Sequence, residues 1–261
     1  MSDPDQLFRS GDIAGTRSAL IDIVRREPAN DSARMFLWQL LALGGEWDKA
    51  TKHLSTLAQL DGEAQMLRSA YNEAVRGEAQ RERVFAGEER AKQFAPSDWV
   101  DGVSEAIQLH ARGDFDAAIA RRDEAFEGAP SLSGTVDDVS FDWITNADPR
   151  FGPCVEMILG EEYVLQPLDQ IKRITSPGPK DLRDLVWQPA EVLFTSGQSL
   201  NVLLPTRYPG TLAAGDPDAI LARSTIWTES PLGALGCGTQ LLATSQDIDI
   251  PLTALRSLVI G

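Results

Sequence analysis

The chain has 261 residues, more than the ~100–200 of a usual single domain, so its length predicts two domains. Its hydrophobic content of 43% and charged content of 24% are typical of a globular protein with a sizeable core. The net charge is −15, and both halves are acidic, with 16 basic and 23 acidic residues in 1–130 and 8 and 16 in 131–261. Neither half offers a broad positive face, which argues against binding to nucleic acid or anionic membranes.

The sequence gives no sign of export or membrane insertion. Its start, MSDPDQLFRSGD, is acidic and lacks the apolar segment of a secretory signal. No run approaches the ~18 apolar residues that a membrane span needs. Cys154 and Cys237 are too few for a disulfide framework. We therefore expect a cytoplasmic protein.

Three similar segments recur in the first half, at Gly11-Asp12, Gly45-Glu46-Trp47 and Gly113-Asp114-Phe115. The second follows the first by 34 residues and the third follows the second by 68, and 34 is the period of tetratricopeptide (TPR) helix–turn–helix repeats. Small Ala residues and a helix-ending Pro or Gly recur in register after each Gly, although the copies are degenerate. The pattern predicts a TPR-like α-solenoid over residues 1–130, and residues 77–94 are expected to form a long polar helix.

The second half has the features of strands. Residues 131–148 are rich in small and polar types, which suits a joint between domains. Beyond them, apolar runs of five to eight residues are bounded by Gly and Pro. Two hairpins are predicted, one turning at Gly160 and one at Thr195–Gln198. The overall prediction is an α+β protein: a TPR-like α-solenoid followed by a β-rich, mainly antiparallel C-terminal domain at 131–261.

Catalytic and cofactor motifs are missing from the sequence. There is no HExxH, CxxC, G-x-S-x-G or phosphate-binding Gly-Lys-Ser/Thr loop, so neither a metal nor a cofactor is predicted. His53 and His110 occupy ordinary helical positions. The clustered carboxylates Asp137, Asp138, Asp142 and Asp148 leave a carboxylate-dependent enzyme open as an alternative. A purely structural module, in which the β domain caps the solenoid, is a further alternative.

Four ordered segments carry a family likeness: FDWITNADPRFGPCVEMILGEEYVLQPLDQI, DLRDLVWQPAEVLF, LLPTRYPG and TIWTE. In this order, and over about residues 141–230, they resemble the ImpE/TagJ family of accessory proteins encoded with bacterial type VI secretion systems. The resemblance implies a non-enzymatic, cytoplasmic adaptor without defined catalytic residues. It also implies binding to a helix of the small contractile-sheath subunit and, through it, a link to the AAA+ ATPase that recycles the sheath.

Partner recognition would bury one apolar face of such a helix, and the acidity of the chain predicts an acidic rim that steers a basic partner. The motif residues expected to contact the partner are Asp142, Trp143, Asp148, Arg150, Arg183, Asp184, Trp187, Arg207 and Tyr208. An internal network of ion pairs and buried aromatics explains the same residues.

The segment 181–194, DLRDLVWQPAEVLF, has no single period and is interpreted as a helix-to-strand junction. Asp181 is expected to cap a short helix. Pro189 is expected to exclude a central strand at its position, so that the strand begins at Ala190.

Overall fold

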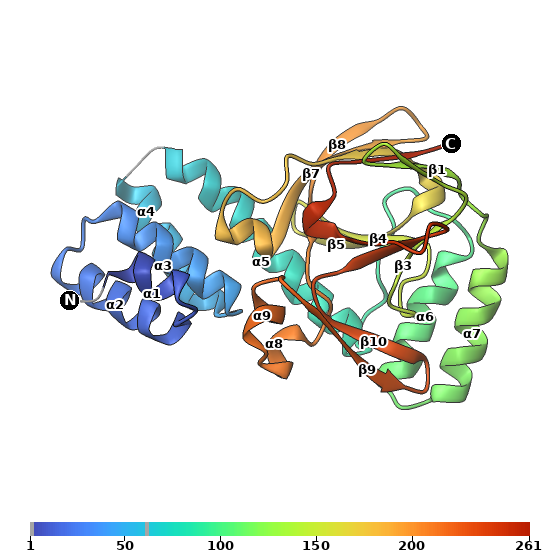
Figure 1. Ribbon diagram of the computed structural model, residues 1–261, viewed down its shortest axis with the longest axis horizontal. Helices are drawn as coiled ribbons and strands as arrows, with labels where there is room; N and C mark the ends of the chain where they lie inside the picture. The colour runs from blue at the N-terminus through green and yellow to red at the C-terminus, as the bar shows by residue number, and fades with distance from the viewer. Residues whose placement is uncertain (1–2, 61–62) are drawn as a thin grey trace. The chain divides into compact units, whose positions relative to one another are not determined.

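A computed structural model describes residues 3–60 and 63–261 and has an α+β fold (Figure 1). Helices predominate as far as Gly128, interrupted by an irregular stretch at 86–99, and strands predominate from Gly134 onward. The helices are α1 (Pro4–Arg9), α2 (Ile13–Arg26), α3 (Asp31–Leu43), α4 (Trp47–Leu60), α5 (Glu63–Phe85), α6 (Val100–Ala111), α7 (Phe115–Gly128), α8 (Thr211–Ala214) and α9 (Pro217–Ile220).

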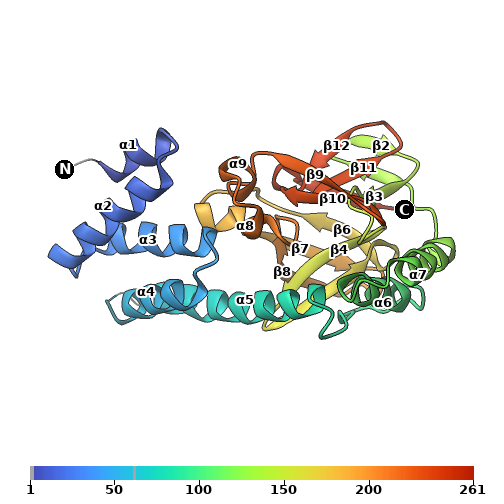
Figure 2. The same ribbon diagram turned by 90° about the horizontal axis from the view of Figure 1, so that it is seen from below.

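The three repeated glycines each lie in the turn of a helical hairpin, as the sequence predicts. Gly11, Gly45 and Gly113 join α1 to α2, α3 to α4 and α6 to α7, with φ of +85°, +70° and +84°. At each turn the Gly amide bonds the carbonyl three residues back, and the next amide bonds the carbonyl five residues back. This is the Schellman pattern, which needs a left-handed residue that Gly adopts at least cost. Figure 2 shows the α6 and α7 pair side by side.

The long polar helix predicted over residues 77–94 is wrong in its second half, because α5 ends at Phe85. Gly87 has φ +77°, and its amide and that of Glu88 make the same pair of bonds to Val84 and Arg83. The helix therefore ends at a fourth glycine turn, which lies outside the 34-residue register.

The β-rich part contains an eight-stranded antiparallel sheet in the order β2-β1-β13-β6-β7-β8-β4-β5. A three-stranded sheet (β12-β11-β3) and the β9–β10 hairpin complete it. The strands are β1 (Gly134–Val136), β2 (Val139–Phe141), β3 (Ile144–Asn146), β4 (Cys154–Leu159), β5 (Glu162–Pro167), β6 (Ile171–Thr175), β7 (Trp187–Phe194), β8 (Ser199–Pro205), β9 (Thr225–Ser230), β10 (Gly233–Gly238), β11 (Leu241–Thr244), β12 (Asp249–Pro251) and β13 (Ser257–Ile260). Short 3-10 turns are Leu168–Gln170, Leu182–Leu185 and Leu252–Ala254.

Both predicted hairpins are confirmed: β4 and β5 turn at Gly160, and β7 and β8 turn at Thr195–Gln198. Residues 131–148, where a joint is predicted, contribute β1, β2 and β3. Their polar Asp137-Asp138 pair is the tight turn between β1 and β2, with φ of +45° and +69°. Short side chains that tolerate a left-handed backbone suit such a turn as well as a linker.

The expectation that Pro189 excludes a central strand is wrong. Pro189 lies inside β7, opposite Leu203 of β8. On the other side β6 pairs with β7 only from Glu191 onward, so no ladder bond requires the missing amide hydrogen. The Pro189 carbonyl accepts a hydrogen bond of 2.8 Å from the Ser176 hydroxyl instead.

The described chain divides into two compact units, and the division falls within α5. The N-terminal unit comprises Met1–Asn72 together with Asp181–Arg183, and the β-rich unit comprises Glu73–Lys180 and Asp184–Gly261. The third helical hairpin, α6–α7, therefore lies in the β-rich unit, and the predicted domain boundary at residue 130 stays a prediction.

The β-rich unit has two apolar clusters. One lies on the large sheet and includes Met157, Val192, Phe194 and Leu204. The other joins the end of α5 and the α6–α7 hairpin to β4 and β5, through Val103, Phe151 and Tyr163 among others. The α6–α7 hairpin is therefore part of the core of this unit.

Candidate functional site

A buried polar network occupies the second cluster of the β-rich unit, and Arg81 of α5 lies at its centre. The Arg81 Nε and Nη2 atoms donate to the two oxygens of Glu156 on β4, at 2.6 and 2.9 Å. Its Nη1 donates to Glu78 at 2.9 Å and its Nη2 to the Arg207 carbonyl at 2.7 Å. Burial disfavours the charge, but the attraction of Glu156 and Glu78 outweighs it, so the pKa of Arg81 lies well above its usual range.

Glu156 accepts four hydrogen bonds and is fully buried. Besides the two from Arg81, one comes from the Tyr163 hydroxyl at 2.8 Å and one from the Gln240 amide. A carboxylate has about four acceptor positions, so all those of Glu156 are filled by the protein. Burial, and next the charge of Glu156, raise the pKa of Tyr163, which keeps the hydroxyl a donor. The network is thus internally satisfied.

Three of the predicted contact residues adjoin this network, and a fourth, Asp184, is buried in the 3-10 turn before β7. Arg207 is 6% exposed and its Nη1 donates to the Ile220 carbonyl at 2.9 Å. Burial lowers its pKa to about 10. Trp187 is 1% exposed and its indole nitrogen donates to Glu78 at 3.1 Å. Tyr208 donates to Asn146 at 3.0 Å, and Asp184 accepts from the Lys180 amide at 2.7 Å.

Asp148 and Arg150 form an ion pair in the loop after β3. Arg150 donates from Nε at 2.9 Å and from Nη2 at 2.6 Å, and Asp148 also accepts from the Gly236 amide at 2.7 Å. Asp148 is completely buried, and the Arg150 side chain is 10% exposed. Through these bonds the pair connects the β3–β4 loop to β10. Asp148 and Arg150 therefore have a structural role in the β-rich unit.

The remaining three predicted residues lie elsewhere. Asp142 is exposed, and Trp143, just before β3, is exposed to 44%. Arg183 belongs to the N-terminal unit, where its guanidinium lies 5.7 Å from the Trp38 ring and 5.3 Å from the Tyr71 ring. The nine residues are therefore not gathered at one surface. As partner contacts they stay a prediction.

A groove on the N-terminal unit brings together residues from three helices, each contributing side chains one helical turn apart. Its lining, which we call the α2–α4 groove, consists of Arg17 and Ile21 from α2, Leu37 and Leu41 from α3, and Lys49, Lys52 and His53 from α4. Its volume is about 130 Å³. Leu37 and Leu41 are 1% and 3% exposed and form the floor. The ionisable lining residues of this groove are all basic, and the acidic rim expected where the partner binds stays a prediction.

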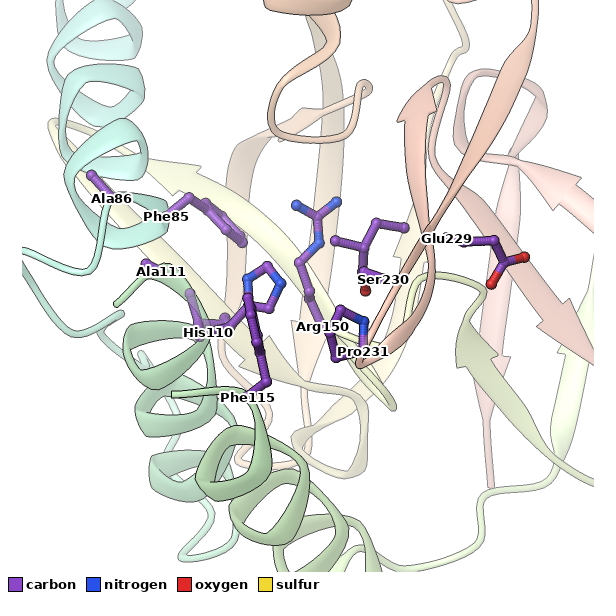
Figure 3. A pocket seen from close by; sticks show the side chains of 11 residues that line it. Phe85, Ala86, His110, Ala111, Phe115, Arg150, Glu229, Ser230 and Pro231 are labelled. Atoms are coloured by element: carbon purple, nitrogen blue, oxygen red, sulfur yellow. The ribbon is translucent and has the colours of Figure 1, made fainter. Parts of the chain in front are cut away.

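A larger hollow of about 490 Å³ lies in the β-rich unit, between α5–α7 and the β9–β10 hairpin (Figure 3). His110 and Phe115 face each other there with ring centroids 5.5 Å apart, and Arg150 lies 5.7 Å from the Phe85 ring. Burial, and then the charge of Arg150, lower the pKa of His110. The Ser230 hydroxyl donates to the Gly233 carbonyl at 2.7 Å. The hollow therefore combines aromatic walls with one histidine and an already paired arginine.

Within residues 3–60 and 63–261, no group of three or more His, Cys, Asp or Glu side chains is placed to hold a metal ion. In the same part of the chain, no helix is both long and apolar enough to cross a bilayer. Cys154 is buried, which raises its pKa well above the usual range.

Sequence reasoning missed the network and the groove. Glu156 carried a signal, since it is the single charge in the apolar run CVEMIL. Arg81 carried none, because it lies in a polar stretch and its partners are up to 126 residues away. The one-turn spacing of the groove residues within each helix is visible in the sequence, but the sequence does not show which helices face one another.

Comparison with known proteins places the chain in a family. The ImpE protein family model matches residues 138–259. The type VI secretion system accessory component TagJ of Pseudomonas aeruginosa is 37% identical over 229 residues, covering 87% of this chain and 82% of TagJ. A crystal structure of a Vibrio parahaemolyticus protein has a TM-score of 0.88 at 18% identity, covering 100% of this chain and 98% of that one, and thus shares the fold. The extent of the match to TagJ and the ImpE match together show that this chain belongs to the ImpE/TagJ family of type VI secretion accessory proteins.

Proposed function

We propose that the chain is a non-enzymatic adaptor that binds the small subunit of the type VI contractile sheath through a helix of that subunit. By doing so it modulates sheath assembly or the recycling of contracted sheath by the AAA+ ATPase. The observation that carries the proposal is the 37% identity to TagJ, itself named a type VI secretion accessory component. The proposal includes a cytoplasmic location and no binding to nucleic acid, as the sequence predicts.

The proposal also treats the helical part as a TPR-like repeat array. Three hairpins with the same glycine turn and the same hydrogen bonds support it. The Ala residues that follow two of these turns, Ala50 and Ala118, are 1% and 0% exposed, as close helix packing requires. Such arrays commonly bind a helix or peptide along a groove lined by their helices.

A non-enzymatic role fits the state of the buried carboxylates. Glu156 has all its acceptor positions filled, and Asp148 is held by Arg150 and the Gly236 amide. Carboxylates occupied in this way are poor general acids or bases, since they have no open position for a substrate proton.

Co-precipitation tests the proposal. The full chain is immobilised and presented with the purified small sheath subunit, with the AAA+ ATPase, and with both together. We expect the sheath subunit to be retained alone and the ATPase to be retained only with it. If neither is retained at low ionic strength by a correctly folded chain, the adaptor function is wrong.

A further inference from the structure

The α2–α4 groove has a chemical character that its surroundings lack. The first 72 residues contain eight basic and ten acidic residues, a net charge of −2, while the chain as a whole carries −15. Three of those eight basic residues line the groove: Arg17, Lys49 and Lys52. A basic groove on an acidic protein attracts acidic partners and repels basic ones.

The size of the groove indicates what enters it. Its volume of about 130 Å³ is below the roughly 300–1,000 Å³ of pockets for small molecules and cofactors. A cavity of about 150 Å³ holds a group as large as benzene. The floor of Leu37 and Leu41, with Ile21 beside it, is apolar. The groove therefore suits one large apolar side chain that projects from a partner protein.

The polar groups around this floor are hydrogen-bond donors. Arg17, Lys49 and Lys52 have no acceptor atom in their side chains. The His53 Nδ1 atom lies 3.3 Å from the Nη1 atom of Arg34, which can only donate, so Nδ1 accepts and Nε2 carries the ring proton. Burial, and next the charge of Arg34, lower the pKa of His53, which favours this neutral form. The complementary partner supplies acceptors, and charged ones for the lysines.

One carboxylate of the chain already binds two of these cations. Glu46, in the turn before α4, accepts from Arg17 at 2.6 Å and from Lys49 at 2.5 Å. Burial raises the pKa of Glu46, but the bonds from Lys49 and Arg17 outweigh it, so this pKa lies below its usual value. With Glu46 ionised and His53 neutral, the three cations leave a charge of +2 at the groove. Glu46 orients Arg17 and Lys49, and Lys52 is exposed.

We infer that the α2–α4 groove binds an acidic amphipathic helix, inserting one large apolar side chain between the helices and pairing its Asp or Glu residues with Lys52, Lys49 and Arg17. This inference rests on the proposed function and adds the place and the chemistry of the contact. In such a helix, acidic residues three or four positions from the inserted apolar side chain lie one helical turn away from it. They contact α4, on which Lys52 and His53 follow Lys49 by three and four residues.

Charge reversal in the full chain tests the inference. We compare the wild type, Lys49→Glu/Lys52→Glu and the control Lys172→Glu, which reverses an exposed lysine on β6 of the other unit. The probes are the purified small sheath subunit and two synthetic helical peptides with the same apolar face, flanked by Glu in one and by Lys in the other. Circular dichroism verifies that each variant is folded, and fluorescence anisotropy or calorimetry measures binding.

For the wild type we expect the sheath subunit and the Glu-flanked peptide to bind, more weakly as salt is raised. The double variant should lose about tenfold or more in affinity for both, because two attractions become repulsions, and should gain affinity for the Lys-flanked peptide. The Lys172→Glu control should bind as the wild type does.

The two proposals fail in different ways. If the sheath subunit binds the wild type and the double variant equally, the groove is not its site and only the inference is overturned. If the sheath subunit does not bind but the Glu-flanked peptide binds in a groove-dependent manner, the proposed partner is wrong and the acidic specificity stands. If the wild type binds neither, or prefers the Lys-flanked peptide, the inference is overturned.

Discussion

At the scale of single residues, several buried charges of the β-rich unit lie beside an opposite charge. Arg81 and Arg207 lie with Glu78 and Glu156, and Asp148 lies with Arg150. Removing one member of a buried pair leaves the other desolvated and unpaired, which costs far more than the pair itself contributes. An exposed pair contributes little, because water screens it.

Arg81→Met should therefore lower the free energy of unfolding of the β-rich unit by about 3–5 kcal/mol. The matched control is Arg76→Met, on the same helix, which breaks a pair with Glu161 whose side chains are 63% and 54% exposed. The control should cost no more than about 1 kcal/mol. Urea denaturation followed by circular dichroism measures both, and equal losses would contradict the assignment of Arg81 as the centre of the network.

His53 should make stability depend on pH. Its pKa in the folded chain lies below its ordinary value of 6.5, so the unfolded chain binds a proton first as the pH falls. The contribution of neutral His53 to the free energy of unfolding is present above about pH 6.5. It is lost as the pH falls toward the pKa of His53 in the folded chain. His53→Gln keeps an acceptor for Arg34 but cannot be protonated.

The difference in free energy of unfolding between the wild type and His53→Gln should thus shrink or reverse between pH 8 and pH 5. Denaturation curves at a series of pH values measure it. Parallel pH profiles for the two proteins would mean that His53 does not titrate differently on folding.

At the scale of elements, the sequence predicted those features that one residue type enforces locally. Gly11, Gly45 and Gly113 end helices because each adopts a left-handed backbone, and Gly160 lies in its predicted hairpin turn for the same reason. Gly87 has the same geometry but lay outside the repeat register, so the end of α5 was missed. The prediction for Pro189 was wrong because a missing amide hydrogen disrupts a sheet only where a neighbouring strand would accept it. Whether β6 reaches Pro189 depends on parts of the chain that are distant in sequence.

Gly113→Ala isolates the backbone effect, since a Cβ there would meet no atom within 4 Å while φ is +84°. It should cost about 1–2 kcal/mol, because a left-handed backbone is unfavourable for Ala. Gly113→Asn should cost less, as Asn tolerates this region. Thermal unfolding of the two variants provides the comparison, and an equal cost for both would indicate a different origin.

At the scale of the whole molecule, the chain enters the N-terminal unit twice, through residues 1–72 and again through 181–183. Composition predicted the change from helices to strands near residue 130, but not this division. The groove and the network were not predicted for a related reason. Their residues come from separate elements, and only packing brings them together.

Two compact units predict two unfolding transitions in calorimetry. Arg183→Ala should lower the midpoint of one transition by weakening the contact with Trp38 and Tyr71, and Arg81→Met should lower the other. A single two-state transition, with equal calorimetric and van't Hoff enthalpies, would show that the units unfold together.

The placement of Asp181–Arg183 also bears on how the family can evolve. Leu182 donates its amide to Gln39 of α3 at 3.2 Å, and Arg183 lies over Trp38. A recombination event that exchanged only the first 72 residues between two relatives would separate these side chains from the tripeptide that contacts them. The first helices therefore cannot be exchanged between relatives on their own. The DLRDLVW segment must be inherited together with them, although more than a hundred codons separate the two.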